Sequence, residues 1–334
     1  MKIGIPRALV YYYYFPLWSR FLEELGHEVV VSPVTNKKIV NQGAKVSVPE
    51  ICVPIKIYNG HILDLLNMPE VDYIFAPRLI TIEKRKTFCP KFLGLPDMLR
   101  YTFPDQWHRF ITPSISGKKD WEMDVKELSA DPFLSQYSDS QLKKAWQRGV
   151  EDWKKFRSIN FLGYTIEEAL ELYKKDGMPA PKQRKEDVSI AIIGYVYNMY
   201  DQFVSMEAVK KLAAMGVNVY TFEMLEQEYI DKHIKPMKKA VFWTFSDKNF
   251  GAGIQYYQDP KIDGLIYLTA FGCGPDSLVG KMLELDSDTY NKPFLTMRVD
   301  EHSGENHLQT RIEAFVDMLK RKKRLMKENI NAVK

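Results

Sequence analysis

The chain has 334 residues and a formal net charge of +4, with 45% hydrophobic and 27% charged residues. This length corresponds to about two domains of ordinary size. The near balance of charge disfavours nucleic acid or an anionic membrane as the main partner. The longest stretch without a charged residue, residues 188–200, is shorter than the ~20 residues that a membrane-spanning helix needs. Because the N-terminus lacks a signal-peptide pattern, we expect a cytoplasmic protein with no membrane partner.

The first half of the chain begins with the pattern of a strand, a helix and a second strand. Residues 2–10 form a mostly apolar run, an amphipathic stretch continues to Gly26, and Val29–Val31 are β-branched. Gly26 is suited to end the helix, because glycine readily adopts the left-handed conformation found there. A third strand is predicted at residues 73–76. We interpret the tyrosines at residues 11–14 as packing at a domain interface.

The second half repeats this order of elements. Its predicted strands are residues 189–195, 217–220, 265–268 and 293–299. The helix between the first two of them spans residues 206–215 and is followed by Gly216, as the first helix is by Gly26. Apolar strands that alternate with helices are typical of parallel sheets covered on both faces. We therefore predict an α/β architecture with two Rossmann-like or flavodoxin-like domains.

A segment of different composition separates the two halves. It is rich in Lys, Glu, Asp and Trp, shows helical spacing, and ends in a glycine- and proline-rich linker. We predict an N-terminal α/β domain over residues 1–117, a helical insert and linker over 118–187, and a C-terminal α/β domain over 188–334. The last domain closes with a helix from about residue 310, and its basic run at residues 320–324 is interpreted as a solvated helix end.

Three cysteines stand at places that suggest a common site. Cys89 and Cys273 follow the predicted strands at residues 73–76 and 265–268, and Cys52 precedes a helical stretch. Ligands of open α/β sheets bind beyond the carboxyl ends of the strands. Proline or glycine flanks each cysteine, which suits a fixed loop better than a core position. We therefore hypothesise that the three thiols meet in a cleft between the domains.

The chemistry of three thiolates leaves several ligands open. Structural zinc sites usually have four ligands, with the cysteines in close pairs, and no such pair is present. A 4Fe–4S cluster is also normally held by four cysteines, so that three would leave one iron with an open coordination position. An iron–sulfur cluster, a zinc ion, and three ordinary buried cysteines without metal all remain compatible with the residues.

Two further residues are candidates for proton transfer. His302 follows the predicted strand at residues 293–299, and a histidine in that place is either a proton shuttle or a loop residue bonded to its acidic neighbours. Glu50 lies two residues before Cys52 and is either a base or a residue that orients the loop. Asp276 and Ser277 are interpreted as the N-cap pair of a helix.

Several segments together resemble the 2-hydroxyacyl-CoA dehydratase superfamily, most closely its activase-related and double-cubane-cluster branches. They are residues 3–9 (IGIPRAL), 50–56 (EICVPIK) with Gly60 and His61, 75–78 (FAPR), 88–91 (FCPK), 271–277 (FGCGPDS), 300–302 (DEH) and 310–315 (TRIEAF). The resemblance implies two α/β domains with a 4Fe–4S cluster between them, ligated by Cys52, Cys89 and Cys273. It also implies a partner, an ATP-hydrolysing iron–sulfur activase that delivers single low-potential electrons.

The resemblance further implies the catalytic component of an oxygen-sensitive system in an anaerobe, which reduces or dehydrates a small substrate at the open iron. A variant of this expectation is a double-cubane 8Fe cluster shared across a homodimer. The dehydratases pair two different subunits, and this single chain does not itself imply a CoA thioester as substrate. The alternatives are an iron–sulfur electron carrier or regulatory subunit without substrate chemistry, and a metal-free binding scaffold.

Overall fold

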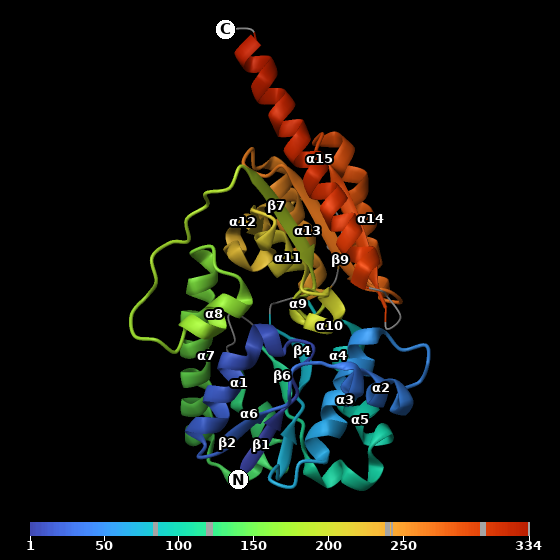
Figure 1. Ribbon diagram of the computed structural model, residues 1–334. Coiled ribbons are helices and arrows are strands. Elements are labelled where there is room, and N and C mark those ends of the chain that lie inside the picture. Colours follow the sequence, from blue (N-terminus) through green and yellow to red (C-terminus); the bar gives the residue numbers. More distant parts are fainter. Residues whose placement is uncertain (83–85, 118–122, 238–240, 242, 301–304, 333–334) are drawn as a thin grey trace. The chain divides into compact units, whose positions relative to one another are not determined.

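The chain folds into two compact units, seen in a computed structural model that describes residues 1–82, 86–117, 123–237, 241, 243–300 and 305–332 (Figure 1). The segments of unit 1 are Met1–Ile159, Ile166–Met178 and Val241–Phe245. Those of unit 2 are Asn160–Thr165, Pro179–Ala240 and Ser246–Lys334. Among the described helices, none combines the length and the hydropathy needed to cross a membrane.

Unit 1 is built on a parallel sheet with the strand order β2-β1-β3-β5. Its strands are β1 (Lys2–Ile5), β2 (Glu28–Val31), β3 (Tyr73–Phe75) and β5 (Phe110–Ile111). The central strand β1 places Ile3 opposite Val29 on one side and Tyr73 on the other. A separate parallel pair joins β4 (Arg78–Thr81) to β6 (Ser114–Ser116). Ile3 and Ile5 are fully buried, so the core of the unit lies around β1.

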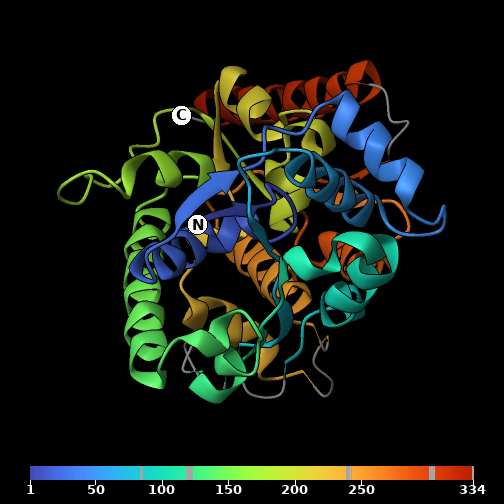
Figure 2. The ribbon, with the colours of Figure 1, turned by 90° about the horizontal axis from the view of Figure 1, so that it is seen from below.

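Helices cover both sides of these strands. In Figures 1 and 2, α1 and α7 lie on one side of the strands of unit 1, and α2, α3 and α5 lie on the other. The α-helices are α1 (Tyr11–Glu24), α2 (Lys37–Val46), α3 (Val53–Leu66), α4 (Pro90–Leu93), α5 (Leu95–Thr102), α6 (Val125–Ser129), α7 (Asp139–Phe161) and α8 (Ile166–Leu172). Short 3₁₀ turns lie at Pro104–Arg109 and Leu134–Gln136. The last two residues of α7 belong to unit 2.

Unit 2 has a parallel sheet with the strand order β10-β9-β7-β8. Its strands are β7 (Val188–Gly194), β8 (Val217–Tyr220), β9 (Gly264–Ala270) and β10 (Phe294–Val299). Every residue of the two central strands, β7 and β9, is buried. This explains why both strands are apolar throughout, since a parallel sheet covered on two faces leaves neither face to water.

The helices of unit 2 pack in pairs on its sheet. They are α9 (Val196–Tyr200), α10 (Gln202–Ser205), α11 (Ala208–Ala214), α12 (Gln227–Ile234), α13 (Thr244–Gln258), α14 (Gly274–Thr289) and α15 (Glu305–Ala332), with a 3₁₀ turn at Phe222–Met224. The first two residues of α13 belong to unit 1. Helix α15 lies against α11, and Gly264 of β9 faces its Phe315 and Leu319. Helix α14 packs on α13, where Gly253 meets Leu283.

The sheets confirm the α/β prediction, because all pairs of named strands are parallel. Two local expectations were wrong. The apolar run at residues 2–10 is a strand only as far as Ile5, since Pro6 follows and Leu9 takes a left-handed φ of 53°. The basic run at residues 320–324 lies within α15 and does not end it, because the helix continues to Ala332. There Lys323 pairs with Asp263, at 2.7 Å between Nζ and Oδ2.

Helices α2 and α3 cross at a distance that only glycine permits. A Cβ atom on Gly43 would overlap the carbonyl oxygen of Lys56, and one on Gly60 would overlap that of Ile39. Because these obstacles are backbone atoms, they cannot rotate away as a side chain would. The backbone contact therefore sets the position of α3 against α2.

We expect Gly60→Ala to lower the free energy of unfolding by about 1–3 kcal/mol, because the added methyl group forces the two backbones apart. Gly94→Ala is the matched control. Its Cβ would lie 3.5 Å from the carbonyl oxygen of Pro90, an ordinary contact, and Gly94 has an ordinary φ of −91°. Urea denaturation followed by circular dichroism measures both variants. Equal stability of the two would contradict the close crossing.

Candidate functional site

All three cysteines occupy the same local position, the N-cap of a helix. Cys52 precedes α3, Cys89 precedes α4 and Cys273 precedes α14, each with extended backbone angles. Each of these helices has proline at its first or second position, where the missing N–H costs no hydrogen bond. The remaining N–H groups of a first helical turn lack partners within the helix. An N-cap thiol therefore lies beside the first N–H groups of the helix and the positive end of its dipole. Some of these groups also donate to the carbonyl oxygen of the capping cysteine, as Ile55 does to Cys52 and Phe92 to Cys89.

In unit 1, Cys52 and Cys89 lie close enough to influence each other electrostatically. Burial raises the pKa of both thiols. The N–H of Ile55 counteracts this at Cys52, and the N–H groups of Lys91 and Phe92 do so at Cys89. The positive charge of Lys91 also lowers the pKa of both, whereas a charged Cys52 raises that of Cys89. The pair thus combines two thiols with backbone donors and one shared cation.

Cys273 belongs to unit 2, in the turn from β9 to α14. Gly272 takes a φ of 78°, which a side chain would disfavour, and so allows the chain to reverse. The N–H of Cys273 then donates to the carbonyl oxygen of Ala270 at 3.2 Å. The hydroxyl and the N–H of Ser277 donate to the carbonyl oxygen of Cys273, at 2.8 and 3.0 Å. These bonds hold the cysteine at the carboxyl end of a central strand.

The structure thus brings Cys52 and Cys89 together in one unit and places Cys273 in the other. All three are half-buried and form no disulfide. Within the described part of the chain, no group of three or more His, Cys, Asp or Glu side chains is arranged to hold a metal ion. The meeting of the three thiols at one cluster therefore stays a prediction from the sequence.

The structure does not test the two residues predicted to transfer protons. Glu50 is exposed in the turn before Cys52, and its catalytic role stays a prediction. His302 lies outside the described residues.

The interpretation of Asp276 and Ser277 as an N-cap pair was wrong, because the N-cap of α14 is Cys273. Asp276 is fully buried in the first turn of the helix. Its carboxylate accepts hydrogen bonds from the hydroxyl of Tyr267 and from Nδ2 of Asn198. Burial raises the pKa of Asp276 to about 6. The only sequence signal for this was an aspartate placed three residues after Cys273.

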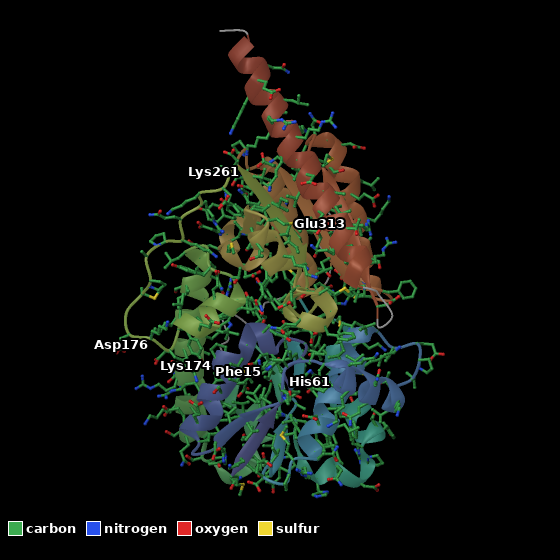
Figure 3. All side chains as sticks on the ribbon, viewed as in Figure 1. Phe15, His61, Lys174, Asp176, Lys261 and Glu313 are labelled. Carbon is green, nitrogen blue, oxygen red and sulfur yellow. The ribbon has the colours of Figure 1, made fainter. Side chains whose placement is uncertain are left out.

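His61 was part of the family pattern without a deducible role, and the structure shows what it does. It lies on α3, the helix that Cys52 caps, and is fully buried (Figure 3). Its Nδ1 is 2.8 Å from the hydroxyl of Ser32, and its Nε2 is 2.9 Å from that of Thr35. Burial, assisted by the charge of Arg7, lowers the pKa of His61 to about 3. A neutral imidazole thus ties α3 to the segment after β2.

His61 is expected to make unit 1 less stable in mild acid. The unfolded chain takes up a proton on this imidazole below its ordinary pKa of about 6.5, whereas the folded chain does so only near 3. The stabilisation is therefore complete above pH 6.5 and decreases as the pH falls, by about 2 kcal/mol at pH 5.

Urea titrations at pH 7.5 and pH 5 measure this loss in the wild type and in His61→Gln. The variant lacks the titrating ring but keeps every other ionisable group, so the difference between the two losses belongs to His61. Equal losses would show that His61 is not buried as a neutral ring.

Comparison with known proteins finds two families. Residues 2–225, more than half of the chain, match the family described as CoA enzyme activase uncharacterised domain. Residues 157–319 match the family described as 2-hydroxyglutaryl-CoA dehydratase, D-component. No curated protein matches the chain. Cys52 and Cys89 lie in the first matched region, and Cys273 lies in the second.

Proposed function

We propose that this chain, which belongs to the 2-hydroxyacyl-CoA dehydratase superfamily, binds an iron–sulfur cluster through Cys52, Cys89 and Cys273 and uses it to reduce or dehydrate a small substrate. The observation that carries the proposal is the common position of the cysteines. These are all the cysteines of the sequence, and each caps the N-terminus of a helix. Three unrelated structural cysteines would have no reason to share this position.

The surroundings of the thiols suit anionic sulfur. Iron binds cysteine as thiolate, and backbone N–H groups that donate to the sulfur stabilise the negative charge and tune the potential of a cluster. Ile55 supplies such a donor to Cys52, and Lys91 and Phe92 supply them to Cys89. Burial disfavours these thiolates when no cation is bound, since it raises the pKa of both thiols. A bound metal reverses that penalty, so the donor set fits a cluster.

The number of thiols favours a cluster with one open iron over a closed structural site. A closed zinc site usually has four protein ligands with its cysteines in close pairs, and the sequence has three widely spaced cysteines. A 4Fe–4S cluster held by three cysteines retains one iron that a substrate oxygen can reach. When bound, the cluster supplies single electrons at low potential. The protein's own part is to hold the three sulfurs and to exclude other ligands.

The two matched families support a partner as well. A name that joins an activase to a CoA enzyme fits a chain that receives electrons from a separate ATP-hydrolysing iron–sulfur activase. The dehydratase match supports a small-molecule substrate for the chain. Within this proposal, Glu50 and His302 carry protons to and from the substrate, and two copies of the chain form a homodimer, in which an 8Fe double cubane is the alternative to the 4Fe–4S cluster.

Iron and acid-labile sulfide, measured on protein purified without oxygen, test the cluster. We expect about four irons per chain, the content of one cubane. Cys52→Ser, Cys89→Ser and Cys273→Ser should each lose most of this iron, because each removes one of three ligands. Ser287→Ala is the matched control, since it alters a serine further along α14, whose hydroxyl donates to the carbonyl oxygen of Glu284, and leaves all thiols in place.

Absence of iron in the wild type, even after reconstitution, would reject the cluster. Full iron in Cys273→Ser would reject the assignment of three ligands. If no added small molecule changes the electron paramagnetic resonance spectrum of the cluster, the chain is an electron carrier without substrate chemistry. A spectrum that shifts when such a molecule binds supports the open iron.

A further inference from the structure

A group of buried polar side chains lies behind Cys273 in unit 2. Asp276 is the third residue of α14 and is inaccessible to solvent. Tyr267 of β9 donates its hydroxyl hydrogen to Oδ1 of Asp276, and Asn198 of α9 donates from Nδ2 to Oδ2 at 3.2 Å. Both carboxylate oxygens of Asp276 are thus engaged by side chains from two other elements. The first turn of α14 is thereby tied to the sheet and to α9.

The group extends across the carboxyl ends of both central strands. Tyr195, directly after β7, is 2.6 Å from Ser246 of α13 between their hydroxyl oxygens. Strands β7 and β9 are paired, with Ile193 opposite Tyr267, so Tyr195 and Tyr267 lie at the same end of the sheet. Tyr195, Ser246 and Asn198 are also buried, at 2%, 0% and 0% exposure. The two hydrogen-bonded groups, Tyr195 with Ser246 and Asp276 with Tyr267 and Asn198, form a buried polar layer at the carboxyl ends of β7 and β9.

The layer has an energetic cost that packing alone does not explain. Burial raises the pKa of Asp276 to about 6, and the groups that oppose this are hydrogen-bond donors. An apolar residue in this position would avoid the cost, as buried charged groups are often no more stable than well-packed apolar ones. What an apolar residue would not provide is a fixed direction, because hydrogen bonds are directional and apolar contacts are not.

Direction matters here because the turn that leads to Cys273 runs through a glycine. Gly272, with its φ of 78°, precedes Cys273 and offers no side chain to restrain the turn. Beyond the first turn, α14 rests on apolar contacts, such as Gly280 against the ring of Tyr267 and Leu283 against Gly253. Those contacts set the distance of the helix from its neighbours. The bonds of Asp276 stop its first turn from sliding or rotating.

We propose that Asp276, held by Tyr267 and Asn198, is a positioning residue for Cys273, which sets the direction of its thiol. The inference rests on the proposed function, in which Cys273 is a cluster ligand. Its own content is the orientation of a thiol, so it can be examined in the cluster-free protein. Asp276 itself touches neither substrate nor cluster in this proposal.

The experiment compares alkylation rates of the three thiols in the cluster-free chain, read by mass spectrometry of their peptides. Asp276→Asn turns one carboxylate oxygen into an amide group that faces the amide donor of Asn198. Loss of one buried hydrogen bond should release the first turn and accelerate alkylation of Cys273 about tenfold. Cys52 and Cys89, in the other unit, serve as internal references and should keep their rates.

A double variant provides the rescue. Asn198→Asp with Asp276→Asn exchanges the carboxylate and the amide. The amide at position 276 then donates to the carboxylate at position 198, and its oxygen still accepts from the hydroxyl of Tyr267. It should restore the wild-type rate at Cys273. Tyr267→Phe removes the other bond without changing charge, and should accelerate Cys273 in the same way if Asp276→Asn does not fold.

Ser189→Ala separates positioning from general destabilisation. It removes a buried hydrogen bond to Asn218 at the amino end of the same sheet, far along the strand from the cysteine turn. It should lower the melting temperature without changing the rate at Cys273. The proposal is overturned if Asp276→Asn leaves that rate unchanged, if the double variant fails to restore it, or if Ser189→Ala accelerates it equally.

Iron content separates this proposal from the proposed function. Both proposals are supported if the wild type binds a cluster, Asp276→Asn loses iron, and the double variant regains it. A wild type that binds no iron while Cys273 still responds to Asp276→Asn would reject the cluster and leave the positioning of the thiol standing.

Discussion

The candidate site depends on one local arrangement, a cysteine that ends a loop and begins a helix. At this point a thiol lies beside the N–H groups of the first helical turn, some of which also donate to the carbonyl oxygen of the capping cysteine. Proline in the next two positions starts each helix at once and fixes its first turn. The same few residues therefore define where the sulfur lies, which donors face it, and where the rigid helix begins.

The parallel strands of unit 2 explain the position of Cys273. Parallel strands leave all their carboxyl ends on one edge of a sheet, and the loops that follow them share that edge. Cys273 stands directly after β9, a strand buried along its whole length, and Asn198 and Tyr195 follow its neighbour β7. The polar layer behind Cys273 thus comes from the topology, which brings polar residues far apart in the sequence to one end of a buried sheet.

Much of the fold was predictable from the sequence. There are physical reasons why some details of the site were not. The strands showed as apolar runs because both faces of each sheet are covered, and the family resemblance is confirmed by the matched families. The neighbourhood of each cysteine was visible in its flanking prolines and glycines. The N-cap role of Cys273 could not be predicted, because cysteine is not a usual capping residue and the nearby Asp276 is a more usual one. The buried bonds of Asp276 and His61 join residues 78 and 29 positions away, a separation that no local pattern reveals.

The two units use different means to hold their cysteine-capped helices. In unit 1, the backbone of α3 is held against α2 at Gly43 and Gly60, and the neutral ring of His61 anchors it to the segment after β2. In unit 2, α14 has apolar contacts further along, and its first turn is fixed by Asp276. Both means bury residues of the helix behind the cysteine, yet leave the capping thiol itself half-buried. A ligand whose geometry is set by its own bonds, such as a cluster, requires sulfurs that do not adjust to it, and a rigid helix start behind each thiol meets that requirement.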